Sequence, residues 1–264
     1  MPKLGHGLGL NYLVTRYTSF APPFPVGLLR DLVAHWKLDE LSGTRYDSTA
    51  NHNDLTDNNS VGYAVGKIGN AAAFDGSPKW LENDAIVVSS GNFSFSCWIQ
   101  VDAGGSLWGI SSIGRDGNAN NITLYSYDGF GPLLFVAEDT EETWVGAEQI
   151  ELGTWFHVVI VVDRTSGVWK RYFNGGAPLI RSSSLLGLAV DGIFLGRSKE
   201  GQYHNGLIDS ASFWSRVISD AEVATLYNNG NGLDYPFVPV IVSNSLEYFG
   251  QPLTYYSQEI TYNP

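Results

Sequence analysis

The stretch that most clearly indicates the fold is residues 93–101, Phe93-Ser94-Phe95-Ser96-Cys97-Trp98-Ile99-Gln100-Val101. Its odd-numbered positions are all apolar, and successive side chains of a β-strand point to opposite faces. This alternation predicts a half-buried strand. A second stretch, residues 155–162, is apolar at every position except His157, which predicts a central strand covered on both faces.

Turn signals divide the rest of residues 32–234 into short stretches of the same kind. Asn174-Gly175 and Asp128-Gly129 each follow a run of β-branched and aromatic residues. Both dipeptides favour hairpin turns, because the central positions of such turns need positive φ. Many short strands joined in this way are typical of sandwiches, so the sequence predicts an all-β fold of two antiparallel sheets packed face to face.

A single segment has the pattern of a helix. Ser219 and Glu222 have the spacing of a capping box. Three apolar residues then fall on one helix face: Val223, Leu226 and Tyr227. Gly230 can end the helix in the left-handed region. The sequence therefore predicts one short helix at about residues 220–228, which covers an end of the sandwich.

Composition argues against several classes of function. The 264 residues carry a formal net charge of −12, which would repel the phosphates of a nucleic acid. Cys97 is the only cysteine, so neither an intrachain disulfide nor a cysteine-based metal cluster can form. Residues 1–7 lack the pattern of a secretory signal, and no apolar run reaches the length of about 18 residues that a membrane span needs. We therefore expect no nucleic-acid or membrane partner.

Both ends of the sequence differ from its middle. Residues 1–31 include Ala21-Pro22-Pro23-Phe24-Pro25, which opposes a helix and disfavours a central strand. Residues 236–264 are again irregular and aromatic. The predicted organisation is an extended N-terminal arm at 1–31, a β-sandwich at 32–235 and a C-terminal extension at 236–264.

Several blocks in the middle of the chain, taken in order, resemble the laminin-G-like domains of the concanavalin A-like jelly-roll kind. The opening of such domains is matched by residues 32–40, Ser42-Gly43 and Asp47-Ser48, and the later blocks are residues 66–71, Phe74-Asp75-Gly76, residues 93–99, residues 154–158 and residues 206–219. Together the matching blocks span about three-quarters of the chain. The resemblance implies that the first and last strands, near Trp36 and Ile208, are neighbours and that both arms leave on one side.

The resemblance also implies a structural calcium ion. Some members of that family bind calcium through the aspartate of an Asp-Ser block and an acid of the closing strand, and these positions are Asp47 and Asp209 here. Asp75 is a third candidate. Calcium takes six to eight oxygen ligands, often from carboxylates. The alternative is that Asp47 and Asp75 are turn residues that accept hydrogen bonds from nearby backbone N–H groups.

Two activities on glycans are compatible with this fold. Sugars stack on exposed aromatic faces, and Trp98, Trp108, Trp144 and Trp169 lie in or beside predicted strands, although most sandwich tryptophans belong to the core. Glycoside hydrolysis needs two facing carboxylates. The acidic stretch at 138–142 lacks the matching acid spacing and is better explained as a polar turn. We therefore expect no enzymatic activity.

The arms and the absence of a signal favour one biological setting above others. Laminin-G-like domains are found in phage virions, which assemble inside the cell and are released by lysis. We therefore expect a virion surface protein, such as a capsid decoration, fibre or tail protein, whose arms bind other virion proteins and which forms a homo-oligomer. The alternative is an extracellular, secreted or cell-surface carbohydrate-binding protein, and a glycoside hydrolase comes third.

Overall fold

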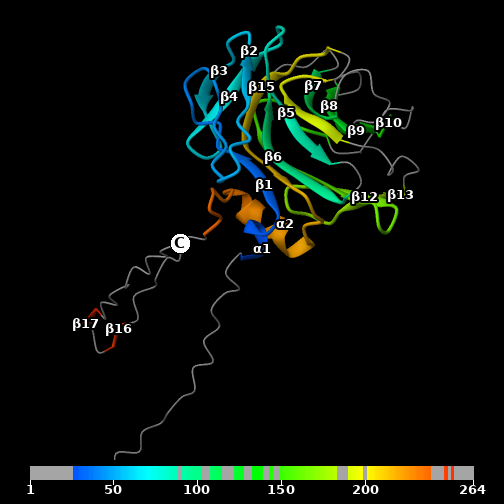
Figure 1. The fold of residues 1–264 in the computed structure, drawn as a ribbon. Helices are drawn as coiled ribbons and strands as arrows, with labels where there is room; N and C mark the ends of the chain where they lie inside the picture. Colours follow the sequence, from blue (N-terminus) through cyan, green and yellow to red (C-terminus); the bar gives the residue numbers. More distant parts are fainter. Residues whose placement is uncertain are drawn as a thin grey trace, which may run out of the picture.

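The computed structural model describes residues 26–88, 91–102, 108–114, 122–127, 133–138, 143–144, 149–182, 190–198, 201–238, 247–248 and 251–252. Two antiparallel sheets lie face to face, as Figure 1 shows, which confirms the predicted all-β sandwich. A separate two-stranded ladder pairs β16 (Glu247–Tyr248) with β17 (Gln251–Pro252). None of the described helices is long and apolar enough to cross a membrane.

The first sheet has eight strands. Its order is β13 (Leu179–Ser182), β12 (Val168–Phe173), β11 (Trp155–Asp163), β6 (Phe93–Val101), β15 (Asn205–Trp214), β4 (Asn70–Asp75) and β3 (Gly62–Val65). The eighth strand, β1 (Leu32–Trp36), pairs with the far end of β15, where Trp36 lies opposite Ala211. The first and last strands of the sandwich are therefore neighbours, as the resemblance implied.

The second sheet has seven strands. Its order is β10 (Thr143–Trp144), β9 (Leu133–Glu138), β8 (Ile122–Tyr127), β7 (Trp108–Ile113), β14 (Val190–Leu195), β5 (Trp80–Val88) and β2 (Thr56–Asn58). The two predicted hairpins are present as β12–β13 and β8–β9. Asn174 and Gly175 both have positive φ, at 49° and 66°, as the turn requires. Asp128-Gly129 lies outside the described residues.

The strand at residues 93–101 is buried on both faces, so the prediction of a half-buried strand was wrong. Phe95, Cys97 and Ile99 belong to the core between the sheets, whereas Trp98 is only 3% exposed on the other face. The cover on that face comes from residues distant in sequence, including Tyr227, whose ring stacks on Trp98. The strand at residues 155–163 is central, between β12 and β6, as predicted.

The predicted helix is α2 (Asp220–Tyr227), and its capping box is complete. Ser219 accepts a hydrogen bond from the backbone N–H of Glu222, whose carboxylate in turn accepts one from the backbone N–H of Ser219. The predicted C-terminal signal was misplaced, because Asn228 rather than Gly230 is the left-handed residue that ends the helix. Asparagine tolerates this conformation better than most residues.

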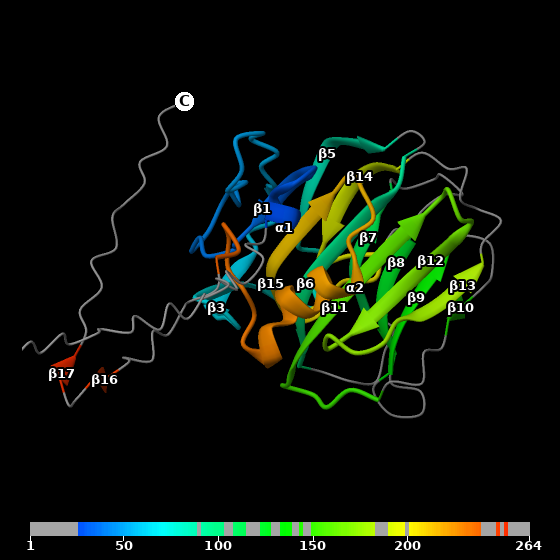
Figure 2. The same ribbon diagram turned by 90° about the horizontal axis from the view of Figure 1, so that it is seen from below.

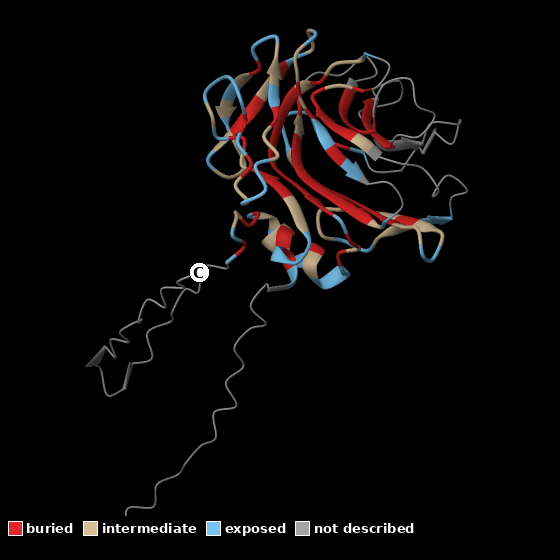
Figure 3. Cartoon of the chain, in the orientation of Figure 1, coloured by how far each residue is buried: buried red, intermediate tan, exposed pale blue. Residues whose placement is uncertain are grey.

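The buried residues, coloured red in Figure 3, include two clusters of apolar side chains. The larger lies between the two sheets. The second lies on the outer face of the eight-stranded sheet, where α2 and a short helix not expected from the sequence, α1 (Val26–Leu29), cover β11, β12 and β15. Figure 2 shows α2 in front of this sheet. The outer face of the seven-stranded sheet has no such helical cover among the described residues.

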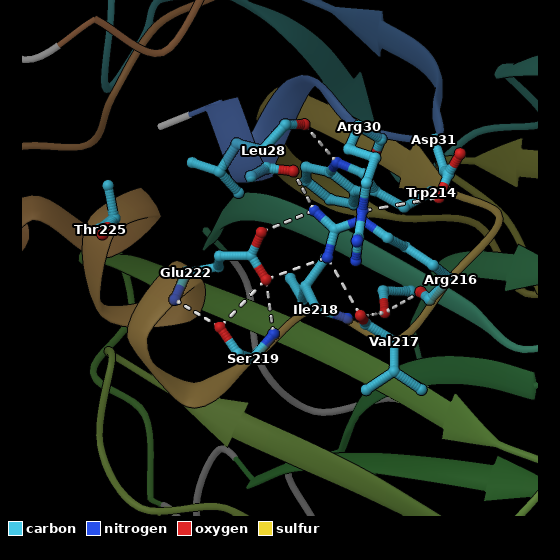
Figure 4. Close-up of polar contacts among 12 residues, drawn as sticks. Leu28, Arg30, Asp31, Trp214, Arg216, Val217, Ile218, Ser219, Glu222 and Thr225 are labelled. Carbon is cyan, nitrogen blue, oxygen red and sulfur yellow. Dashed lines mark hydrogen bonds and ion pairs between the residues drawn. The ribbon is translucent and has the colours of Figure 1, made fainter. Parts of the chain in front are cut away.

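Arg216 ties the two helices to the end of β15 (Figure 4). Its guanidinium donates to both carboxylate oxygens of Glu222, at 2.9 Å to Oε2 and 2.6 Å to Oε1. It also donates to the backbone carbonyls of Arg30, at 2.8 Å, and of Gly27. We call this set of contacts the Arg216 clamp. Because Arg216 is only 8% exposed, the clamp is a largely buried ion pair.

Both ends of the packed domain meet at Trp214. The indole N–H of Trp214 donates to the carbonyl of Leu28 at 2.7 Å, and its ring lies 6.2 Å from that of Phe237. Leu28 and Phe237 are both fully buried. The packing therefore extends past residues 32 and 235, and the two ends of the described domain lie together beside α2.

Candidate functional site

Asp47 is a turn residue in the structure. Its Oδ1 accepts hydrogen bonds from the backbone N–H groups of His35, at 3.0 Å, and Thr49, at 2.9 Å. Its Oδ2 accepts from the Thr49 hydroxyl at 2.7 Å and from the N–H of Asn53 at 3.0 Å. Four donors therefore occupy the carboxylate and hold the loop after β1 against that strand.

Asp75 ends β4 and lies at the surface. It accepts hydrogen bonds from the backbone N–H and hydroxyl of Ser77 and pairs with Lys79 at 2.7 Å. These partners lower the pKa of Asp75, the hydrogen bond from Lys79 contributing most. Its geometry is that of a turn aspartate with an exposed ion pair.

Asp209 differs from both, because it is fully buried in the centre of β15. Its Oδ2 accepts from the backbone N–H of Ile68 at 2.8 Å, while its Oδ1 has no hydrogen-bond partner among the described residues. Burial raises the pKa of Asp209 to about 7, and the charge of Asp39 adds to this effect. Asp39 binds the other side of the same loop, accepting from the N–H of Asn70 at 2.6 Å.

The chemistry of this pair fits a calcium ion. A cation beside Asp39 and Asp209 would neutralise two neighbouring carboxylates and give the unpartnered oxygen of Asp209 a ligand to bind. No hydrogen bond in the described part connects Asp47 or Asp75 to the pair. The described residues contain no group of three or more histidine, cysteine or acidic side chains suited to a metal, so backbone carbonyls and water would supply the remaining ligands. Calcium binding stays a prediction.

The tryptophans expected to stack on sugars are only partly described. Trp98 and Trp169 are 3% and 2% exposed, so neither offers a face to a ligand. The side chains of Trp108 and Trp144 lie outside the described part. The structure instead points to a tryptophan that the sequence argument did not single out, at the start of β5.

Five side chains form a cluster on the outer face of the seven-stranded sheet: Trp80, Glu82, Phe194, Arg197 and Tyr203. We call it the Trp80 cluster. Leu81, Ile193 and Leu195 belong to the core between the sheets, so the residues that alternate with them face outward. Glu82 and Phe194 lie opposite each other on the paired strands β5 and β14.

The Trp80 cluster is a half-buried aromatic surface with a guanidinium stacked over two of its rings and a carboxylate at one edge. The guanidinium carbon of Arg197 lies 5.0 Å from the ring centroids of both Trp80 and Phe194. The ring of Tyr203 lies 6.2 Å from that of Trp80, with 32° between the planes. The indole N–H of Trp80 donates to Glu82 at 2.7 Å. Trp80, Arg197 and Tyr203 are all half-buried.

A tight loop between β14 and β15 positions two members of the Trp80 cluster. Arg197 and Tyr203 form an antiparallel bridge, and the N–H of Ser198 donates to the carbonyl of Gln202 at 2.8 Å. Gly109 of β7 lies directly beneath, since a Cβ there would come within 2.1 Å of the Ser198 nitrogen. The loop is therefore held on the sheet, as binding loops often are.

Comparison with known proteins agrees with this architecture. Domain 4 of AbnA, a GH43 extracellular arabinanase from Geobacillus stearothermophilus solved in complex with arabinotriose, matches with a TM-score of 0.58 at 23% identity, over 74% of this chain and 97% of that one. Trypanosoma rangeli sialidase in complex with sialic acid matches at 0.59 and 14%, over 77% and 34%. The binding domain of botulinum neurotoxin serotype G matches at 0.54 and 14%, over 74% and 50%.

These likenesses show a shared fold, and this chain spans about a third of the sialidase and half of the neurotoxin domain. A search of curated proteins gave no match. The family model of the concanavalin A-like lectin/glucanase superfamily matches residues 74–224, which is more than half of the sequence. That segment runs from β4 through the closing strand to α2 and includes most of both sheets. The chain belongs to the concanavalin A-like lectin/glucanase superfamily.

Proposed function

We propose that this chain is a non-catalytic glycan-binding protein and that the Trp80 cluster is its contact surface. The observation that carries the proposal is the half-buried set of Trp80, Tyr203 and Arg197 on the outer face of the seven-stranded sheet, where the described residues include no covering helix. The outer face of the other sheet is covered in part by α1 and α2.

The chemistry of the Trp80 cluster matches that of a sugar. One face of a pyranose or furanose ring is lined by C–H groups and packs on an aromatic ring, while its hydroxyls need polar partners. Trp80 and Tyr203 supply aromatic surface, the guanidinium of Arg197 lies over the Trp80 ring as a hydrogen-bond donor, and the carboxylate of Glu82 lies at its indole N–H edge. A few placed polar groups around an apolar surface are typical of small-molecule sites.

The Trp80 cluster is suited to binding rather than to hydrolysis. Glycosidases use two carboxyl groups that face each other across the scissile bond, about 5–9.5 Å apart. Among the five residues of the cluster, Glu82 is the one carboxylate, and it already accepts a hydrogen bond from Trp80. The acidic residues at 139–142 lie outside the described part. Two of the structural neighbours were solved with a bound sugar, arabinotriose and sialic acid, which supports testing glycans first.

Replacing Trp80 by alanine is expected to weaken glycan binding by about tenfold or more, because a central aromatic anchor typically contributes at least 1.4 kcal/mol to binding. The measurement is a glycan array on the full chain, followed by calorimetric titration of the best ligand. Tyr46→Ala is the matched control, since Tyr46 is 61% exposed but lies outside the Trp80 cluster. Equal binding by Trp80→Ala and the unaltered protein would place the glycan elsewhere.

A second candidate function is display of this domain on a virion, as a capsid decoration, fibre or tail protein. It is supported by the position of the two ends of the described domain. Leu28 and Phe237 both pack on Trp214 beside α2, on the outer face of the eight-stranded sheet, whereas the Trp80 cluster lies on the outer face of the other sheet. Arms that leave from one face would hold the domain on a particle with its opposite face turned outward.

Near the C-terminal end of the described domain, the surface also has a hollow of about 560 Å³, lined by residues that include Ile68, Leu233, Tyr235 and Val238.

Deleting residues 1–25 is expected to abolish incorporation into particles while leaving the melting temperature unchanged, because the deletion stops short of the buried Leu28. Gradient-purified particles and thermal melts provide the two measurements. Normal incorporation of the shortened chain would rule out anchoring by this arm.

A further inference from the structure

The strand β3 forms one edge of the eight-stranded sheet and lacks the features that normally protect an edge. It pairs with β4 on one side, and no other described strand pairs with it. Tyr63 and Val65 are 52% and 81% exposed. Residues 58–66 contain neither a charged residue nor a proline, which are the usual means of blocking an edge strand.

The ladder with β4 determines which backbone groups of β3 face outward. The N–H of Gly66 donates to the carbonyl of Gly69 at 2.9 Å, so positions 66 and 69 form a hydrogen-bonded pair. Hydrogen-bonded and non-hydrogen-bonded pairs alternate along an antiparallel ladder. Ala64 therefore bonds inward to Ala71, and the N–H and C=O groups of Tyr63 and Val65 point to the free side.

The side chains of Tyr63 and Val65 extend an apolar surface. Tyr63 lies opposite Ala72 in the ladder, so it shares the sheet face on which Ala72 and Phe74 enter the core between the sheets. Val65 lies two residues further along and points the same way. The edge of β3 thus presents one aromatic and one β-branched side chain beside a row of backbone donors and acceptors.

We propose that β3 pairs with β3 of a second copy of this chain, in antiparallel orientation about a twofold axis at Ala64. In this register Tyr63 of each copy lies opposite Val65 of the other, and the two pairs exchange four backbone hydrogen bonds. Aromatic and β-branched residues opposite each other stabilise a ladder. The eight-stranded sheets of the two copies become one continuous sheet.

The occupant is a second copy because the outward backbone groups of Tyr63 and Val65 pair with themselves in an antiparallel register. Two copies with a net charge of −12 repel each other at long range, whereas residues 58–66 are uncharged and bring no like charges together. Nearby, Arg45 donates to the carbonyl of Val61 at 3.0 Å and so closes the edge before Gly62. The unpaired part of the β3 edge is therefore limited to the residues that pair in the twofold register. A twofold contact uses the same surface on both copies, so it produces a dimer and not a longer chain of copies.

A cysteine at position 64 tests the register directly. Residues on the axis form a non-hydrogen-bonded pair with Cα atoms about 4.5 Å apart, which permits a disulfide. Ala64→Cys is expected to form a covalent dimer under mild oxidation, whereas Ile180→Cys, at an exposed position on the opposite edge strand β13, is expected to remain monomeric on a non-reducing gel. The native Cys97 is fully buried and does not interfere.

Sedimentation velocity over a concentration series provides the second measurement, on the full chain. The unaltered chain is expected to shift from monomer to dimer, and Val65→Lys to remain monomeric with an unchanged melting temperature, since Val65 is 81% exposed. Ile180→Lys is the matched control and is expected to dimerise normally. Cross-linking of Ala64→Cys no faster than of Ile180→Cys, or normal dimerisation of Val65→Lys, would overturn the proposal.

Discussion

Replacing Arg216 by methionine is expected to lower the free energy of unfolding by about 3–5 kcal/mol, because it leaves the partner of a buried ion pair without its cation. The Arg216 and Glu222 side chains are 9% and 19% exposed. Burial alone would raise the pKa of Glu222, but hydrogen bonds from Arg216 and Ser219 outweigh it and hold the pKa below its ordinary value. The substitution also leaves the carbonyls of Gly27 and Arg30 without their donor.

Urea denaturation at neutral pH measures this loss. Lys79→Met is the matched control, because the Lys79–Asp75 pair is equally short, at 2.7 Å, but its side chains are 29% and 58% exposed. Exposed pairs contribute at most about 1 kcal/mol, so the control should change stability little. If Arg216→Met lowers the free energy of unfolding no more than Lys79→Met does, the Arg216 clamp does not hold the helices on the sheet.

Acidification from pH 7.5 to 4.5 is expected to lower the free energy of unfolding of the unaltered protein by about 3 kcal/mol more than that of a His157→Gln variant. His157 is 2% exposed, and burial lowers its pKa to about 3 in the folded protein. The unfolded chain binds a proton at a pKa of about 6.5. Stability from this residue is therefore complete above that pH and declines as the pH falls toward the folded value.

The comparison with a variant matters because other groups titrate over the same range. Burial lowers the pKa of His204 to about 4, which acts in the same direction as His157. Asp209, whose pKa burial raises to about 7, acts in the opposite direction, since the folded protein takes up its proton before the unfolded chain does. Urea denaturation of each protein at both pH values isolates the contribution of His157. His52→Gln, at an exposed position, should follow the unaltered protein, and the same behaviour in His157→Gln would contradict the prediction.

The parts of the fold predicted correctly depend on neighbours in sequence. The capping box at Ser219 and Glu222 and the positive φ of Asn174 and Gly175 are both set within a few residues, so the sequence alone reveals them. The position of the central strand β11 followed from a run that is apolar at every position of 155–162 except His157. Local signals of this kind hold because tertiary packing does not oppose them here.

The features that were missed depend on contacts between distant segments. The strand at residues 93–101 was predicted to be half-buried, but Tyr227, more than a hundred residues further along, stacks on Trp98 and helps to cover the second face. Asp209 has Asp39 rather than the expected Asp47 as its described acidic neighbour, because the loop at 66–70 lies between them. In each case the sequence supplied the right residue type, whereas its partner depended on which strands pair.

The Trp80 cluster likewise depends on contacts between segments that are distant in sequence. Trp80 and Glu82 lie on either side of the buried Leu81, a local pattern that the sequence analysis did not single out. Nothing local indicates that Arg197 and Tyr203 join them, since these come from a loop more than a hundred residues further along. Trp80 alone, half-buried at the start of β5, does not make a site; Arg197 and Tyr203 complete it.

The meeting of both ends at Trp214 has a consequence for how this domain can be transplanted. A domain whose ends are adjacent can replace a short surface loop of an unrelated host protein without stretching the host backbone, and it tolerates circular permutation. Leu28 and Phe237 both contact Trp214, so a short linker between them would give a permuted chain. New ends would open at the turn between Asp163 and Val168, which joins β11 and β12 of the eight-stranded sheet, whereas the Trp80 cluster lies on the other sheet. The sandwich is therefore a domain that can be inserted into a larger protein.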